Sequence, residues 1–210
     1  MQIKTIPVGY MGVNCYLLVD EPQKKGVIFD PGTATEELCR VISEEFAAIE
    51  WVGILLTHGH FDHIDGVQAI HELTGAPVMI HRGDGDMLGD NRKNLADIFG
   101  CSCAPCKWDR LLTEETLEVG GLRLRVLSTP GHSPGSVCYL LEEAGVMFSG
   151  DTLFENSIGR TDMPGASVRD MVQTLRMLKE MPENYRVLPG HGDATTLQRE
   201  REQNPWLAQV

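Results

Sequence analysis

The residues best suited to chemistry in this chain are histidines and aspartates in four short segments. Residues 57–63 read Thr-His-Gly-His-Phe-Asp-His, so three histidines and an aspartate stand close together. His132, Asp151 and His191 stand separately further along the chain. Neutral imidazole together with carboxylate is a ligand set that Zn²⁺, iron and manganese accept. These residue types therefore predict a metal site.

Each of the four segments directly follows an apolar run that is typical of a β-strand. The strands are 52–56 before residues 57–63, 122–127 before His132, 146–148 before Asp151, and 185–188 before His191. Strands of a layered α/β fold bring their carboxyl ends to one edge of the structure. We therefore expect the four segments to converge there, helped by the glycines and prolines that flank them and allow sharp turns.

The number of candidate ligands indicates how many ions the site takes. They are His58, His60, Asp62, His63, His132, Asp151 and His191. Seven protein ligands are too many for one tetrahedral ion, and they suit two ions that share a bridging carboxylate and a hydroxide. The expected cofactors are two Zn²⁺ ions, with iron or manganese as alternatives.

Helical and strand periodicities alternate along the rest of the chain and predict an α/β fold. An amphipathic helix is expected over 33–49, with Thr35 as its cap. The other expected helices are 65–73, 167–180 and 195–204, with one or two short helices within 84–99; the other expected strands are 14–20, 26–30, 77–80 and 136–141. A chain of 210 residues with this pattern is expected to form a single domain, 1–210.

Composition narrows the function classes. A formal net charge of −12 argues against a nucleic-acid partner, because phosphate binding depends on clustered Lys and Arg. The amino terminus does not resemble a secretory signal, and no apolar run reaches membrane-spanning length. We therefore expect no membrane association and a cytoplasmic location. The six cysteines are then not expected to form a disulfide framework. The sequence leaves the oligomeric state open.

The histidine-rich segment 57–63, with His132, Asp151 and His191 downstream, resembles the metallo-β-lactamase superfamily. Within it the chain is most similar to the glyoxalase II-like (hydroxyacylglutathione hydrolase-like) hydrolases. Supporting segments are 29–32 (Phe-Asp-Pro-Gly), 149–154 (Ser-Gly-Asp-Thr-Leu-Phe), 157–162 (Ser-Ile-Gly-Arg-Thr-Asp) and 188–192 (Leu-Pro-Gly-His-Gly). The resemblance implies a four-layer αββα sandwich of the metallo-β-lactamase type.

The resemblance also implies a division of labour among the ligands. The first metal would take His58, His60 and His132, the second would take Asp62, His63 and His191, and Asp151 would bridge them. Asp30 and Asp162 would orient ligand histidines through hydrogen bonds, a role that fixes the tautomer and the ring direction.

The activity implied is the hydrolysis of a small-molecule thioester by attack of a metal-bridging hydroxide on the carbonyl. Asp62 would help to orient the attacking water. True β-lactamases of the superfamily often carry cysteine where this chain has Asp151, which disfavours antibiotic hydrolysis. The chain also ends at Val210 without the helical carboxyl-terminal region with which glyoxalase II helps to hold glutathione, so the sequence leaves open whether glutathione is recognised.

Two other functions remain open from the sequence. Persulfide dioxygenases carry a similar motif set but use one iron, which here would be bound by His58, His132 and Asp151. Alternatively, residues 101–106, Cys-Ser-Cys-Ala-Pro-Cys, could form a metal-binding or redox module. Structural roles are expected for His71, on a helix, and for Arg160, which would pair with Asp162 to brace its loop.

Overall fold

The computed structural model describes residues 1–210, and its core is a pair of six-stranded sheets. The first sheet has the spatial order β1 (Gln2–Val8), β2 (Val13–Asp20), β3 (Lys25–Phe29), β4 (Glu50–Leu56), β5 (Val78–His81) and β6 (Arg110–Leu112). The second has the order β14 (Thr195–Thr196), β13 (Arg186–Pro189), β10 (Val146–Gly150), β9 (Val137–Leu141), β8 (Leu122–Ser128) and β7 (Glu115–Val119). A small hairpin, β11 (Leu153–Phe154) and β12 (Ser157–Ile158), forms a third sheet that contacts β10 and β13.

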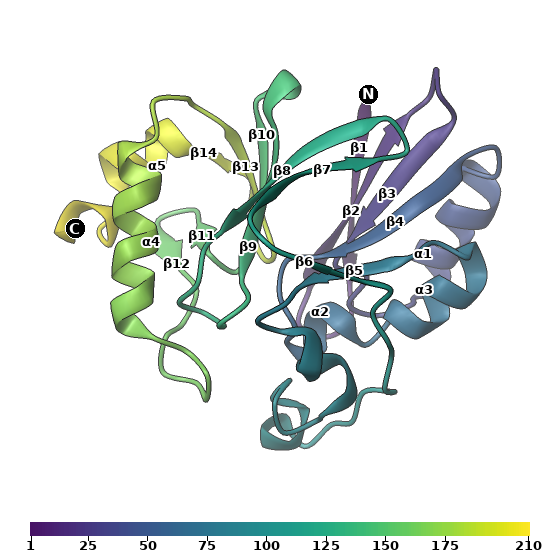
Figure 1. Cartoon of the computed structure of the whole chain (residues 1–210), viewed down its shortest axis with the longest axis horizontal. Helices are drawn as coiled ribbons and strands as arrows, with labels where there is room; N and C mark the ends of the chain where they lie inside the picture. The colour runs from purple at the N-terminus through teal and green to yellow at the C-terminus, as the bar shows by residue number, and fades with distance from the viewer.

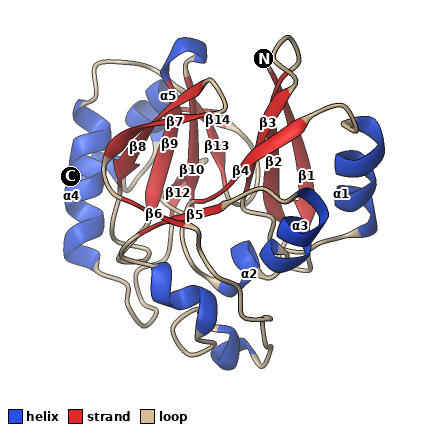
Figure 2. Ribbon diagram, turned by 45° about the vertical axis from the view of Figure 1, so that its right-hand side comes forward, coloured by secondary structure: helices blue, strands red, loops and turns tan.

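Helices cover the outer faces of both sheets (Figures 1 and 2). Beside the first sheet lie α1 (Glu36–Arg40), α2 (Phe61–Ile64) and α3 (Val67–Thr74), and beside the second lie α4 (Val168–Glu180) and α5 (Leu197–Gln203). The order helix, sheet, sheet, helix is the expected αββα sandwich. Thus the predicted fold class is confirmed.

Three apolar clusters hold the layers together. The cluster between the sheets joins Phe29 of β3 to Phe148 of β10, whose rings stack with centroids 4.0 Å apart. A second cluster packs the first sheet against α1 and α3, and a third packs the second sheet against α4 and α5. Strand β4 contributes Leu55 to the cluster between the sheets and Ile54 to the helix side. This burial on both faces explains why its sequence is almost wholly apolar.

The structure differs from the predicted elements where local hydrogen bonds interrupt the periodic pattern. The expected helix 33–49 begins later, at Glu36, but its expected cap is confirmed, since the Thr35 hydroxyl accepts the Leu38 N–H at 3.1 Å. After α1 it widens into a π-helical turn, Val41–Glu45. Here the Ser43 hydroxyl bonds the Cys39 carbonyl at 2.8 Å, an interaction that bends helices.

Other boundaries shift by a few residues. The expected helix 195–204 starts as the short strand β14 before α5, and the region 84–99 contains two 3₁₀ turns, Gly85–Gly89 and Ala96–Phe99. No helix combines the length and hydropathy that crossing a bilayer requires.

Candidate metal centre

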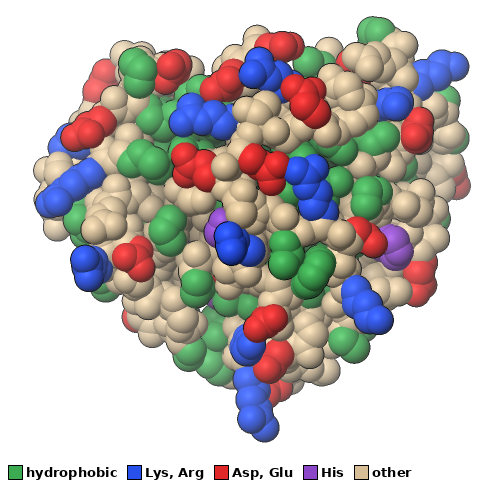
Figure 3. Space-filling model, viewed as in Figure 1, with side chains coloured by type: hydrophobic (Ala, Val, Ile, Leu, Met, Phe, Trp, Pro, Cys, Tyr) green, Lys and Arg blue, Asp and Glu red, His purple; other side chains and the backbone are tan.

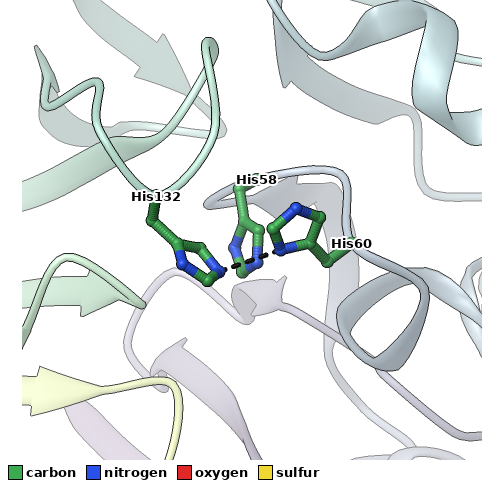
Figure 4. Close-up of side chains that lie close together, drawn as sticks. All are labelled: His58, His60 and His132. Carbon is green, nitrogen blue, oxygen red and sulfur yellow. Dashed lines mark hydrogen bonds between the residues drawn. The ribbon is translucent and has the colours of Figure 1, made fainter. Parts of the chain in front are cut away.

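All seven candidate ligands lie together at the edge where β4, β8, β10 and β13 end. Three overlapping groups form there, and within each group the potential donor atoms lie within 4.8 Å of one another. The groups are His58–His60–His132, His58–His63–Asp151 and Asp62–His63–His191. Figure 4 shows the first group, in which three rings from two separate loops converge. The first and third groups match the two ligand sets that the resemblance implies.

Asp151 lies between the two outer groups. Its Oδ1 is 3.3 Å from His63 Nε2, and its Oδ2 is 3.5 Å from His132 Nε2 and 3.7 Å from His191 Nε2. One carboxylate therefore faces histidines of both groups, which is the position that a bridging ligand needs.

Unpartnered buried atoms show that these residues fit metal ions. The atoms are His58 Nε2, His60 Nε2, His63 Nε2 and Asp151 Oδ1, none of which has a hydrogen-bond partner. An unsatisfied buried polar atom costs about 1–3 kcal/mol, so natural proteins rarely collect several in one place. Cations bound to these atoms would remove that cost, and imidazole with carboxylate suits zinc, iron or manganese.

Hydrogen bonds behind the histidines fix their orientation. Asp30 accepts the Thr57 N–H at 2.8 Å and the Thr57 hydroxyl at 2.6 Å, and it lies 3.0 Å from His63 Nδ1. The Nδ1 atoms of His132 and His191 donate to the backbone carbonyls of Arg160 (2.9 Å) and Met11 (3.1 Å). These bonds turn the Nε2 atoms toward the cluster, where His132 Nε2 lies 2.9 Å from His60 Nδ1.

The expectation for Asp30 agrees with this geometry, but the expectation that Asp162 orients a histidine is wrong. Asp162 forms a two-point ion pair with the Arg160 guanidinium, at 2.7 and 2.9 Å, on the surface. The backbone carbonyl of Arg160 orients His132 instead. The expected bracing pair of Arg160 and Asp162 is confirmed.

Burial and neighbouring charges shift the pKa values of the candidate ligands. Burial, together with the neighbouring histidines, lowers the pKa of His60 to about 3 and that of His58 well below its usual value. Burial acts against the charged form of His63 too, but the surrounding aspartates outweigh it and raise the pKa of His63. The pKa of Asp151 is lowered because His63 and other histidines outweigh the effect of burial. Asp151 is therefore ionised and ready to act as a ligand.

Asp84 is a buried residue of the site that sequence reasoning missed. Its carboxylate accepts the Gly59 N–H at 3.0 Å, the Ser133 hydroxyl at 2.6 Å and the Gly135 N–H at 2.6 Å. It thereby ties the loop of His58 and His60 to the loop of His132. Its position in the irregular region 84–99 gave no signal, because no periodicity or ligand spacing marks it.

The cysteines of residues 101–106 do not join a metal-ligand group, since the three groups in the chain contain only histidine and aspartate. Burial is the main effect that raises the pKa of Cys103 to about 12 and that of Cys106 to about 11. Their thiols are therefore protonated and poor nucleophiles. The geometry gives no support to a separate metal or redox module.

Known proteins resemble this chain over nearly its whole length. A curated relative, the probable metallo-hydrolase YqgX of Bacillus subtilis, is 36% identical over 99% of this chain and 98% of its own length. The hydroxyacylglutathione hydrolase GloC of Haemophilus influenzae is 31% identical, again over 99% of this chain and 98% of its own length.

Three solved structures share the fold. BLEG-1, described as a B3 metallo-β-lactamase, superposes with a TM-score of 0.92 at 38% identity, covering 98% of this chain and 99% of its own. TTHA1623 in a di-iron-bound form gives 0.84 at 34% identity, covering 97% and 99%. ETHE1 from Myxococcus xanthus gives 0.76 at 27% identity, covering 100% and 85%.

The profile of the metallo-beta-lactamase superfamily matches residues 8–191, a span that contains all seven ligands. Fold, ligand groups and relatives thus converge, and the chain belongs to the metallo-β-lactamase superfamily.

Proposed function

We propose that this protein is a hydrolase that uses two metal ions to cleave thioesters of small molecules. The observation that carries the proposal is the pair of donor groups, His58–His60–His132 and Asp62–His63–His191, with Asp151 between them. The similarity to a hydroxyacylglutathione hydrolase at 31% identity supports the thioester as the bond that is cleaved.

When bound, the ions would polarise the substrate carbonyl and lower the pKa of a water to near neutrality. The residues of the chain then have to position that water and shield the reaction. Asp62 faces the cavity, and its Oδ2 lies 3.3 Å from His191 Nε2. Burial opposes ionisation of Asp62, but His63 and His191 lower its pKa, so the carboxylate can accept a hydrogen bond from the water.

The leaving group explains why few other acids are needed. A thiolate departs without a strong general acid, because a thiol has a pKa of about 8.5. Apart from its ligand residues, the cavity wall is mostly apolar. An ester or amide, whose leaving group is a stronger base, would gain less from such a site.

A second candidate is a mononuclear iron persulfide dioxygenase. ETHE1 shares the fold at 27% identity, and the three residues that would bind its iron by analogy, His58, His132 and Asp151, all lie in the cluster. We place this candidate second, because the Asp62–His63–His191 group is equally complete and would have no role in it.

Activity assays with and without oxygen separate the two candidates. We expect thioester hydrolysis to be equal under air and nitrogen. It should fall about 100-fold or more in His60→Ala, because His60 is a ligand in the two-metal hydrolase but not in the single-iron dioxygenase. The control His71→Ala removes a histidine whose Nδ1 bonds the Ala76 carbonyl, and it should keep the activity. Oxygen uptake with glutathione persulfide that persists in His60→Ala would contradict the proposal.

The substrate panel also needs a lactone, a phosphodiester and a cephalosporin. The cephalosporin belongs there because BLEG-1, at 38% identity, is described as a β-lactamase, whereas Asp151 in place of cysteine argues against that activity. Turnover of the cephalosporin in preference to every thioester would overturn the assignment.

A further inference from the structure

We propose, building on the hydrolase function above, that the substrate carries an apolar acyl chain, which lies in the cavity over the ligand cluster against Phe61, Leu95 and Phe99. The cavity has a volume of about 370 Å³, and its floor is formed by five of the predicted ligands. A volume of this size suits a small organic molecule. The residues that line the cavity indicate the chemical class of that molecule.

The walls of the cavity are mostly apolar, and their apolar residues are Met11, Phe61, Leu95, Phe99, Phe154, Ile158 and Met163. Phe61 and Leu95 belong to the cluster of the first sheet, against which Met163 packs, whereas Ile158 packs against the outer cluster of the second sheet. Pockets of this kind recognise the apolar part of a ligand by burial, while a few polar groups fix the reacting centre. Here most of the polar groups are the predicted ligands, and Ser157 and Arg160 are the other polar residues of the lining.

The cavity lacks a free cation for a charged substrate. Arg160 is the one Lys or Arg among the lining residues, and it is already paired with a carboxylate, because its Nε and Nη2 atoms donate to Asp162. The chain as a whole has a net charge of −12, and Figure 3 shows basic and acidic side chains interspersed on the face in view. A polyanionic thiol such as a nucleotide-linked one therefore fits poorly.

The wall at Leu95 is held in place at a conformational cost. Leu95 has φ of 73°, in the left-handed region that leucine rarely adopts. Asn94 enforces it, because its side chain bonds the Met87 carbonyl at 3.1 Å and the Ala96 N–H at 3.0 Å, while its own carbonyl accepts the Phe61 N–H at 2.9 Å. Strain that is held by surrounding bonds is a mark of functional segments.

Phe99 extends this wall to the mouth of the cavity. Its ring lies on that of Phe61, with centroids 5.1 Å apart, yet 42% of the residue is exposed. Ile98, in the same 3₁₀ turn, is also exposed but does not line the cavity. An apolar chain of the substrate would cover the Phe99 ring and gain from its burial.

The test is a series of neutral N-acetylcysteamine thioesters with acetyl, butyryl, hexanoyl and octanoyl groups. We expect kcat/KM to rise about threefold per methylene up to hexanoyl, since burying a methylene is worth a factor of this order. S-Lactoylglutathione, with a polar acyl group and a charged thiol, should be a poorer substrate than the hexanoyl thioester.

Variants at the rim connect the length dependence to the wall. Phe99→Ala should flatten the length dependence by lowering kcat/KM more for the hexanoyl than for the acetyl thioester. Met11→Ala, at the other exposed rim position, should flatten the length dependence too. Ile98→Ala should keep the wild-type length dependence, and melting curves check that all three variants fold.

The outcomes separate this inference from the function on which it rests. Turnover of all chain lengths at one rate would overturn the apolar acyl chain and leave the thioesterase function standing. A length dependence that Phe99→Ala and Met11→Ala leave intact would overturn the assigned wall. No turnover of any thioester would overturn the function and the inference together.

Discussion

The residues of this site differ in whether their roles can be predicted from the sequence. The ligands are visible because metal binding requires particular side chains, and residues such as His132 and His191 each follow a strand. Asp30 is visible only through the family resemblance, and its bonds to Thr57 and His63 agree with that role. Asp84 is invisible, because an ordinary aspartate becomes important only when folding brings Gly59 and Ser133 to it.

At the residue scale, Asp84→Asn should weaken metal binding as well as stability. The amide replaces one acceptor oxygen with donors, so at least one of the bonds to Gly59, Ser133 and Gly135 is lost inside the protein. We expect a loss of about 1–3 kcal/mol in the free energy of unfolding and a metal affinity about 10–100-fold lower.

Chemical denaturation and a competitive zinc-chelator titration measure the two effects. Asp86→Asn is the matched control, because the Asp86 side chain is 84% exposed and pairs only with Lys93 on the surface. Equal effects of the two substitutions would show that Asp84 does not position the ligand loops.

At the element scale, strands were easier to predict than the turns between them. Strand β4 is an almost wholly apolar run and helix α4 has strong periodicity, and their predicted ranges agree with the structure to within two residues. The π-helical turn after α1 and the strand β14 depend on local hydrogen bonds and on pairing with β13, which a periodicity analysis does not contain. The turn after β13 lies directly against two candidate ligands, Asp151 and His63.

Gly190, in the loop after β13, has no room for a side chain. A Cβ at this position would collide with Asp151 Oδ1 and would lie 2.7 Å from His63 Cε1. We expect Gly190→Ala to lower kcat/KM by about 100-fold, because displacing a reacting group by about 1 Å has an effect of that size.

Gly89→Ala is the control, since a Cβ there meets nothing within 4 Å and its φ is ordinary. Steady-state kinetics on both variants at saturating zinc make the comparison. Retention of full activity by Gly190→Ala would mean that the carboxylate of Asp151 need not hold its place.

At the scale of the whole molecule, the layer order could be predicted but the cavity could not. The αββα order follows from the alternating elements and the family resemblance. The cavity walls, however, come from segments as distant in sequence as Met11, Phe99 and Ile158, and their meeting depends on how the two halves of the sandwich pack. Apolar residues in such segments look like ordinary loop or core residues until the fold joins them.

Removing the metal should destabilise the whole protein, because bound ions stabilise only the folded state. At free zinc about 1,000-fold above the dissociation constant, the gain is about 4 kcal/mol. For a chain of this size that corresponds to a melting temperature about 8–16 °C higher with metal than after chelation. Calorimetry before chelation, after it and after zinc is restored measures the shift. A melting temperature unaffected by proven metal loss would contradict a site that relieves unpartnered buried atoms.

The central claim, two metal ions joined by Asp151, is tested most directly by the zinc content of the protein. Plasma mass spectrometry would be applied to zinc-saturated protein after removal of unbound metal, for the wild type and for His191→Ala. His191 belongs to the Asp62–His63–His191 group and not to the other outer group. We predict two ions per chain in the wild type and about one in His191→Ala. One ion per chain in both proteins would contradict the account.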